Sequence, residues 1–284
     1  MTGTAAPPAA LGPDAGEGKR APVVGFSGIA VRGGVASPAS RAVPEETPVA
    51  LVFDGATQAV MMATPGDLTD FARGFAFTEG LAGPEEIRGI GEVGTAEGIE
   101  LRLWLTPGSA ARLAARRRLF AGPTGCGLCG IESLTEVARS PKTVPVGRTF
   151  TIDDISTALG ALEAGQALNR AARALHAAAF WTPEDGLVAV REDVGRHNAL
   201  DKLAGALLAS GADVARGVVL LTSRVSVEMV QKAAAIGAPM IVAVSVPTAL
   251  ALRTAEAAGM TVIAIARGDG FEVFTRPDRI LGIG

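Results

Sequence analysis

The first hundred residues alternate short apolar runs with glycine and proline, which is typical of β-strands joined by turns. One stretch departs from this pattern. From Asp67 to Gly80, directly after the turn pair Pro65 and Gly66, apolar residues recur at a helical spacing. We therefore predict an α+β N-terminal domain over residues 23–121, with a second, arginine-rich helix near its end. The clearest elements are the strands PVALVF (48–53), AVMMAT (59–64) and IELRLWL (99–105), and the second helix SAARLAARRRLF (109–120).

A different pattern begins after about Pro145, where apolar strands alternate regularly with helical stretches. The strands are continuously apolar, which indicates a sheet covered on both faces and largely parallel. We therefore predict an α/β domain over residues 131–284, larger than the first and built on a mainly parallel sheet. Its strands are GLVAVR (186–191), GVVLLTS (217–223), PMIVAVS (239–245) and MTVIAIA (260–266).

A polar turn follows each of these four strands: REDVGRH, TSRVS, SVPT and ARGDG. Ligands of open α/β sheets bind at the carboxyl ends of the strands, where helix N-termini present free N–H groups to anions. The second half is therefore expected to bind a ligand at that edge of its sheet.

Composition restricts the partners. The chain has 284 residues, a formal charge of −3 and a pI near 5.6, which argues against a general electrostatic grip on nucleic acid. No apolar run is long enough to span a membrane, and the N-terminus lacks the pattern of a signal peptide. We expect a cytoplasmic protein that binds neither nucleic acid nor membrane. Residues 1–22, rich in Ala, Pro and Gly, predict a disordered tail.

The two cysteines of the chain, Cys126 and Cys129, lie three positions apart in GPTGCGLCG. Four glycines in nine residues predict a mobile loop over 122–130. Such a pair serves metal binding, dithiol redox chemistry or sulfur transfer. A structural zinc ion needs four ligands, and the chain offers only two other soft candidates, His176 and His197, both far downstream. Zinc is therefore the weaker alternative.

Other assignments of the cysteine pair fit less well. A zinc deaminase carries His-x-Glu ahead of its Pro-Cys-x-x-Cys, and no histidine precedes Cys126. A thioredoxin-like enzyme places its pair at a strand-to-helix junction, whereas this pair lies between two unlike halves. Two buried, purely apolar cysteines are disfavoured by the glycines around them.

A persulfide carrier needs an accessible thiolate of low pKa. The helix expected from Ile131 would favour a thiolate at Cys129 through its N-terminal dipole. An arginine run precedes the loop and would do the same, although a solvated helix face explains it equally well. Its members are Arg112, Arg116, Arg117 and Arg118.

Two of the polar turns offer candidates for ligand binding. His197, at a helix start within REDVGRHNALDK (191–202), can hydrogen-bond a base, a phosphate or a thiol-bearing partner; the alternative is a capping network built by Asp193. Ser223, Arg224 and Ser226 are candidates to hold a phosphate at the next helix start; the alternative is that Ser226 is an ordinary N-cap.

The turn after the last strand, IARGDG (265–270), offers a third candidate. Arg267 and Asp269 suit a nucleotide, with the guanidinium on a phosphate and the carboxylate on a donor edge of the base. A plain hairpin turn explains its glycines equally well.

Five motifs, taken in order along the chain, resemble the FdhD family of formate dehydrogenase accessory proteins. The likeness runs from about Val23 to Arg279 and is far more specific than the cysteine pair alone. The motifs are GFAFTEG (74–80), GCGLCG (125–130), EDVGRHNALDK (192–202), SRVSVEMVQKAA (223–234) and FTRPDRI (274–280).

This resemblance implies a sulfurtransferase-type sulfur carrier. It would accept persulfide sulfur from a cysteine desulfurase and pass it to the molybdenum bis(molybdopterin guanine dinucleotide) of a formate dehydrogenase. It implies that Cys126 carries the persulfide with Cys129 as its companion, that the protein is a homodimer, and that the C-terminal part is similar in topology to the cytidine deaminase fold. GDP is expected to mimic part of the cofactor. The family's cofactor-binding turn falls on Ile265, Ala266, Arg267, Gly268, Asp269 and Gly270.

One segment departs from the family pattern. The family usually carries Thr-Gly-Gly three positions ahead of a His-Ala-Ala run, but this chain has Ala172, Arg173, Ala174 and Leu175 before His176. Close backbone approach by glycine is therefore lost there. Two alternatives stay open: a guanine-nucleotide or molybdenum-cofactor chaperone that transfers no sulfur, and a zinc-stabilised interaction module.

Overall fold

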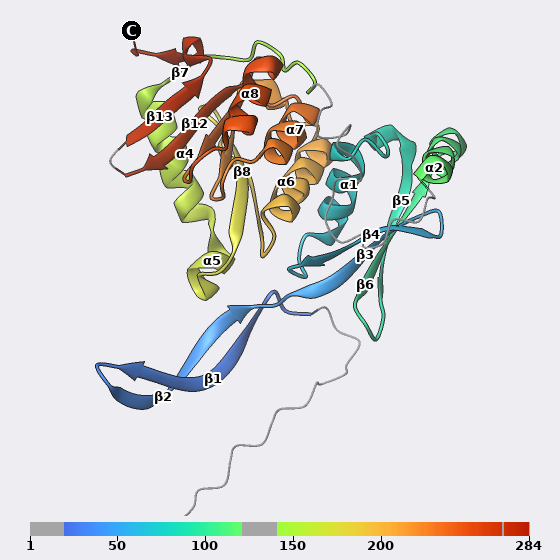
Figure 1. Ribbon diagram of the computed structural model, residues 1–284, viewed down its shortest axis with the longest axis horizontal. Coiled ribbons are helices and arrows are strands. Elements are labelled where there is room, and N and C mark those ends of the chain that lie inside the picture. Colours follow the sequence, from blue (N-terminus) through green and yellow to red (C-terminus); the bar gives the residue numbers. More distant parts are fainter. Residues whose placement is uncertain (1–19, 121–140, 269, 284) are drawn as a thin grey trace, which may run out of the picture.

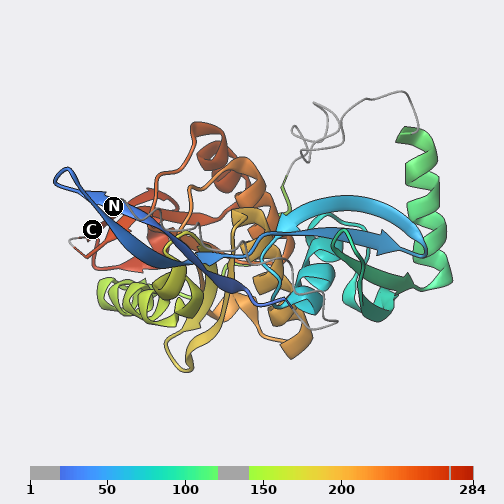
Figure 2. The ribbon, with the colours of Figure 1, turned by 90° about the horizontal axis from the view of Figure 1, so that it is seen from below.

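The computed structural model describes residues 20–120, 141–268 and 270–283. Two halves, each built on a sheet, lie side by side (Figure 1). A two-stranded ribbon projects from the body beneath them (Figures 1 and 2). The ribbon consists of β1 (Val23–Arg32) and β2 (Val35–Pro44).

The N-terminal half is a four-stranded sheet in the order β4-β3-β6-β5, with α1 on one face. Residues of β6 alternate between buried leucines and outward residues such as Arg102 and Trp104, as a sheet covered on one face requires. The predicted strands and the predicted helix are confirmed. The elements are β3 (Thr47–Phe53), β4 (Ala56–Ala63), α1 (Leu68–Thr78), β5 (Ile87–Gly94), β6 (Ile99–Leu105) and α2 (Pro107–Phe120).

The C-terminal half is a six-stranded sheet in the order β13-β12-β11-β10-β8-β9. Helices α6, α7 and α8 cover one face and α4 covers the other, so that neighbouring residues of β10 enter different cores. This confirms a sheet buried on both faces. Its strands are β8 (His176–Thr182), β9 (Gly186–Asp193), β10 (Val218–Leu221), β11 (Met240–Ala243), β12 (Thr261–Arg267) and β13 (Gly270–Thr275). The helices are α4 (Ile152–Gly165), α5 (Ala167–Ala172), α6 (Arg196–Ser210), α7 (Val227–Ala235) and α8 (Ala249–Ala258), and β7 (Phe150–Thr151) pairs with β14 (Ile280–Leu281).

The prediction of a mainly parallel sheet is wrong. Only the pairings of β11 with β10 and with β12 are parallel, whereas β13 with β12, β8 with β10 and β9 with β8 pair antiparallel. Short turns join β8 to β9 and β12 to β13, and a short turn can only reverse the chain. The two strands that were not predicted, β8 (HAAAFWT) and β13 (GFEVFT), lack the continuous run of large apolar residues by which the other strands were recognised. The cytidine-deaminase-like topology stays a prediction.

The two halves meet where α1 crosses α6, and Figures 1 and 2 show the two helices side by side. A Cβ added at Gly74 would lie 1.7 Å from the backbone oxygen of Asp201, and one at Gly205 would lie 1.9 Å from the backbone oxygen of Asp70. The helices therefore touch backbone to backbone, which only glycine at these two positions allows.

Candidate functional site

The carboxyl ends of four strands gather at one edge of the six-stranded sheet. Strands β10, β11 and β12 are parallel, and β9 runs in the same direction because β8 is antiparallel to both β9 and β10. Helices α6, α7 and α8 all begin at this edge. The prediction that the polar turns converge is therefore confirmed.

Backbone hydrogen bonds join three of these turns to one another. The N–H of Val225 donates to Val246 (3.2 Å), and the N–H of Thr248 donates back to Val225 (3.0 Å). The N–H of Ile265 donates to the carbonyl of Ser245 (3.1 Å). The turns that follow β10, β11 and β12 thus form one continuous rim.

The predicted cofactor turn contains an irregular strand. Ala264 pairs with Glu272 and Arg267 pairs with Gly270, so Ile265 and Ala266 form a bulge in β12. Ile265 has a φ of 54°, which a β-branched residue adopts only under strain, and such strain is common at binding sites. Strands β12 and β13 pair directly across this turn, with Arg267 opposite Gly270, as the hairpin alternative held; Arg267 and Gly268 are exposed.

The rim carries three arginines that form no ion pair with any residue that the structure describes. Arg196, Arg224 and Arg267 have no carboxylate of the described residues within 4.0 Å, and Arg267 contacts only the carbonyl of Val244 among them (3.4 Å). Of the acids at this edge, Asp193 is fully buried and used internally, whereas Glu228, in the first turn of α7, is partly exposed and is near enough to Arg196 to feel its charge. Free guanidinium groups beside three helix N-termini suit a phosphate-bearing ligand.

The remaining candidates of the TSRVS turn differ in their orientation. Ser223 is buried and its hydroxyl donates to the carbonyl of Arg224 (3.1 Å), whereas the Arg224 side chain is exposed. Ser226 occupies the N-cap position of α7 but makes no side-chain capping bond. Arg224 is therefore the residue of this turn that is placed to meet a ligand.

His197 lies at the junction of the two halves. Burial, followed by the positive charges of Arg196 and Lys232, lowers the pKa of His197 to about 4, so the ring is neutral at neutral pH. Glu228 and Glu79 oppose that shift, and the ring's Nε2 is buried with no hydrogen-bond partner among the described residues. Charged groups of α7 and Glu79, the residue after α1, are therefore near enough to influence the ring.

Asp193 builds the capping network that was the alternative for its turn. Its carboxylate accepts from the N–H of Gly195 (2.7 Å), from Nδ2 of Asn198 (3.0 Å) and from the N–H of Thr64 (3.0 Å). It also pairs with Lys202 (2.7 Å), and neither charged group is exposed. Because Thr64 belongs to the N-terminal half, this network joins the two halves.

A second buried network is built around Asp201, the residue before Lys202 in α6. Nζ of Lys232 contacts both oxygens of Asp201 (2.9 and 3.0 Å) and Oγ1 of Thr78 (3.0 Å), and Thr78 donates to Asp201 (2.6 Å). Glu79 completes the group. Residues of the motifs 74–80, 192–202 and 223–234 therefore hold the halves together, a role that sequence reasoning missed.

Sequence reasoning considered His176 only as a metal ligand and Arg196 only as part of a motif, and it assigned neither of them to the rim. His176 begins β8 opposite Asp193, and burial together with the charge of Arg196 lowers its pKa. Arg196 stands in a quoted motif, yet the fact that it forms no ion pair with a described residue is a property of the fold alone. A basic residue at the first position of a predicted helix is the signal that would have found it.

The cysteine pair lies outside the described residues, as do Asp269 and residues 1–19 of the predicted tail. The expected mobility of 122–130 is thus untested. Within the arginine run, Arg112 is bound to Glu86 (2.7 Å). The hydrogen bond from the N–H of Gly83, followed by the bond from Arg112, lowers the pKa of Glu86 to about 2. Among described residues, no three His, Cys, Asp or Glu side chains are grouped to hold a metal.

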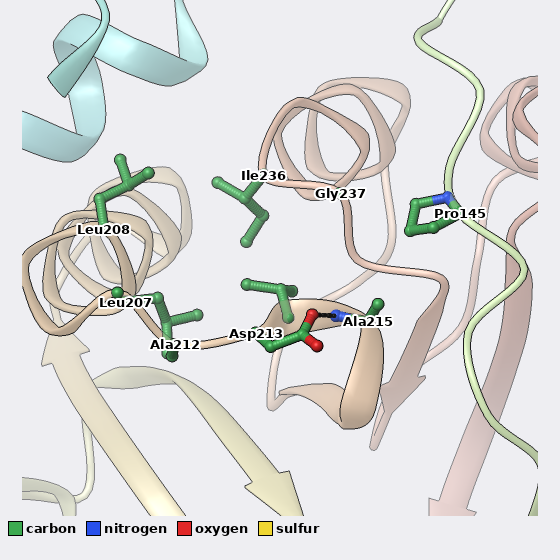
Figure 3. A pocket seen from close by; sticks show the side chains of 10 residues that line it. Pro145, Leu207, Leu208, Ala212, Asp213, Ala215, Ile236 and Gly237 are labelled. Carbon is green, nitrogen blue, oxygen red and sulfur yellow. Dashed lines mark hydrogen bonds between the residues drawn. The ribbon is translucent and has the colours of Figure 1, made fainter. Parts of the chain in front are cut away.

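A pocket of about 350 Å³ lies at the opposite edge of the sheet (Figure 3). It is formed where α6 and α7 end, and Asp213 beside it accepts from the N–H of Ala215 (3.1 Å). It is therefore separate from the rim. Its lining is mostly apolar: Pro145, Leu207, Leu208, Gly211, Ala212, Asp213, Val214, Ala215, Ile236 and Gly237.

Comparisons with known proteins give a consistent assignment. Residues 44–281 match the model of the FdhD/NarQ family. The chain is 52% identical over 254 residues to "Sulfur carrier protein FdhD" of Agrobacterium fabrum, covering 89% of this chain and 94% of that one. It is 51% identical over 244 residues to the protein of the same name from Brucella abortus, covering 85% and 91%.

A solved structure agrees with these relatives. The fold is similar to the crystal structure of a protein described as a formate dehydrogenase accessory protein from Desulfotalea psychrophila, with a TM-score of 0.73 and 25% identity over 91% of this chain and 99% of that one. In the part of the chain that the structure describes, no helix is both long and apolar enough to cross a membrane.

Because the family model covers most of the chain and the curated relatives are about half identical to it, the chain belongs to the FdhD/NarQ family.

Proposed function

We propose that this protein is a sulfur carrier that serves a formate dehydrogenase. The cysteine pair of GCGLCG supplies the thiol, and relatives at about half identity carry the name of a sulfur carrier. In the loading step the Cys126 thiolate attacks the outer sulfur of a cysteine desulfurase persulfide. A new S–S bond forms at Cys126 while the donor S–S bond breaks and the donor leaves as a thiolate, so no net oxidation occurs.

The observation that supports the identity of the acceptor is the rim of three arginines that form no ion pair with a described residue. Molybdenum bis(molybdopterin guanine dinucleotide) carries a diphosphate in each dinucleotide, and Arg224 and Arg267 offer guanidinium groups beside the N-termini of α7 and α8. Arg196 offers a third at the start of α6. The cofactor is here the substrate that receives sulfur, and GDP is the soluble mimic of its nucleotide end.

Sulfur loading has a direct test. Intact-mass measurement after incubation with a cysteine desulfurase and cysteine should show a gain of about 32 Da, one sulfur atom, in the native chain. Cys126→Ala should abolish the gain. A native chain that stays at its starting mass would contradict the carrier role, and a gain retained in the Cys126→Ala variant would move the persulfide to Cys129.

Nucleotide binding is tested separately by calorimetry with GDP. Replacing Arg267 by alanine should weaken binding about tenfold or more, since a charge-assisted contact to phosphate is lost. Arg216→Ala is the matched control: Arg216 is also exposed, but it precedes β10 and so lies at the opposite edge of the sheet. Equal affinities for the native chain and both variants would place the nucleotide elsewhere.

These two measurements also separate the alternatives. A cofactor chaperone without sulfur transfer would bind GDP and gain no mass. A zinc-stabilised module would instead retain about one equivalent of metal per chain after purification without chelator. We place the protein in the cytoplasm, because a thiol that must stay reduced persists there.

A further inference from the structure

A second pocket, of about 260 Å³, lies where the segment 143–149 meets the C-terminal motif FTRPDRI (274–280). It opens at the edge of the six-stranded sheet where α8 ends and β12 begins, which is the edge opposite the rim. The motif has no part in the rim or in the junction between the halves. Three arginines and one acid are among the residues that line the pocket: Arg148, Arg276, Arg279 and Asp278.

Arg279 places a buried positive charge beside this pocket. The residue is only 5% exposed, its Nε donates to the carbonyl of Val146 (2.7 Å), and its Nη1 donates to Oγ1 of Thr261 (2.9 Å). These partners are neutral, and no carboxylate of a described residue lies within 4.0 Å of the guanidinium. Burial lowers the pKa of Arg279, the charge of Arg276 lowers it further, and Asp278 opposes both. A buried charge is costly unless a counter-charge accompanies it, so this guanidinium calls for an anion.

The acids near the pocket are engaged by the two more exposed arginines. Asp278 accepts from Nε and Nη2 of Arg276 (3.0 and 3.1 Å), and Glu184 accepts from Arg148. Glu256, near the end of α8, is also close enough to act on Arg276. The buried guanidinium is therefore left as the cation whose charge no described acid offsets by direct contact.

The segment 143–149 adds backbone donors to the same pocket. The side chain of Val144 is buried and its N–H donates to the carbonyl of Ala258 (2.9 Å), which fixes the segment to the end of α8. The next residues line the pocket, and no described residue accepts a hydrogen bond from the N–H of Val146, Gly147 or Arg148. Free backbone N–H groups beside guanidinium groups form the donor set that binds oxyanions.

We propose that this pocket binds an oxyanion of the phosphate class, with Arg279 at its base and Arg276 and Arg148 at its mouth. The volume is below the range of about 300–1,000 Å³ that is usual for drug-sized ligands, so it suits a single phosphoryl group. The bound anion would tie FTRPDRI to the segment that follows the cysteine pair in sequence. This site is separate from the nucleotide rim and does not depend on sulfur transfer.

Hydrogen exchange with rapid quenching, read by mass spectrometry, tests the site in the intact chain. About 10 mM inorganic phosphate, added at constant ionic strength, should slow exchange of the amides at 146–148 at least fivefold, because free N–H groups gain an acceptor. Arg276→Gln should reduce this protection to less than about twofold, because a guanidinium is lost and Asp278 is left to repel the ion. Arg253→Gln is the matched control: Arg253 is exposed on α8, lies outside the pocket and carries the same charge, so its loss should leave the protection intact.

Three results would overturn the proposal. They are unchanged exchange at 146–148 in up to about 50 mM phosphate, equal protection in Arg276→Gln and the native chain, and protection confined to the turns of the rim. A second series with glycerol 3-phosphate identifies the source of the phosphoryl group. Stronger protection than by inorganic phosphate would assign the pocket to a phosphorylated small molecule, and weaker protection would assign it to free phosphate.

Discussion

Substitution of Gly74 by alanine tests the contact between the two halves directly. The added Cβ would lie 1.7 Å from the backbone oxygen of Asp201, and real Cβ contacts essentially never fall under 3.0 Å. α1 must therefore withdraw from α6 by about 1.3 Å, the difference between these distances. No side chain can yield instead, since the atoms met are backbone atoms of Asp201 and Gly205.

The magnitude follows from two opposing effects. Replacing glycine by alanine inside a helix is intrinsically favourable by about 1 kcal/mol. Overpacking of a tight contact costs about 1–3 kcal/mol or more, and withdrawal of α1 also lengthens the bonds of Thr78 to Asp201 and Lys232. We expect Gly74→Ala to lower the free energy of unfolding by roughly 2–4 kcal/mol.

Gly160 provides the matched control. It lies exposed within α4, and a Cβ there meets nothing within 4 Å, so Gly160→Ala should stabilise the protein by roughly 0.5–1 kcal/mol. Unfolding in urea, followed by circular dichroism and tryptophan fluorescence, measures both variants. Trp104 reports on the four-stranded sheet and Trp181 on the six-stranded one. If Gly74→Ala proved as stabilising as Gly160→Ala, the close helix contact would be refuted.

Three further predictions concern buried charge, pH and the cysteine. Lys202→Met should cost roughly 3–5 kcal/mol in urea unfolding because it leaves the Asp193 carboxylate buried without its partner; a neutral result would mean that water reaches the site. The folded pKa of His197 is about 4 against 6.5 unfolded, so its contribution to stability is full above pH 6.5 and falls towards pH 4. His197→Gln should flatten the pH dependence of unfolding in that window, and an unchanged slope would assign it to other groups. Cys126→Ala should leave the free energy of unfolding within about 1 kcal/mol of the native value while abolishing activation of a formate dehydrogenase. A loss of stability on the scale of a core deletion would make the cysteine structural.

The sequence predicted elements with a strong local pattern and failed where the neighbours of a strand decide its role. β6 and α1 were recognisable because their own residues alternate or repeat in period with the buried face. β8 was not, since three alanines give no such signal, and its burial depends on β9 and β10 beside it. The direction of the outer strands likewise depends on turn lengths that the apolar pattern does not report.

The candidate site shows the same division. That Arg267 and Arg224 follow strands was readable, and parallel β10 to β12 brought their turns together. That Asp193 is consumed by Lys202 and a backbone N–H of Thr64 was not readable, because those partners lie in different parts of the chain. Residues of one motif, EDVGRHNALDK, consequently divide between the rim and the junction.

The buried networks at the junction make each half complete the hydrogen bonds of the other. A fragment beginning at residue 141 would keep Asp193 paired with Lys202 and Asp201 with Lys232, but would expose the strip of α6 around Gly205 to water. It would also lose the hydrogen bonds that Thr64 and Thr78 make to the two buried ion pairs. Removal of the N-terminal half would therefore loosen α6, whose first turn forms part of the rim. We expect the rim to keep its shape only when both halves are present.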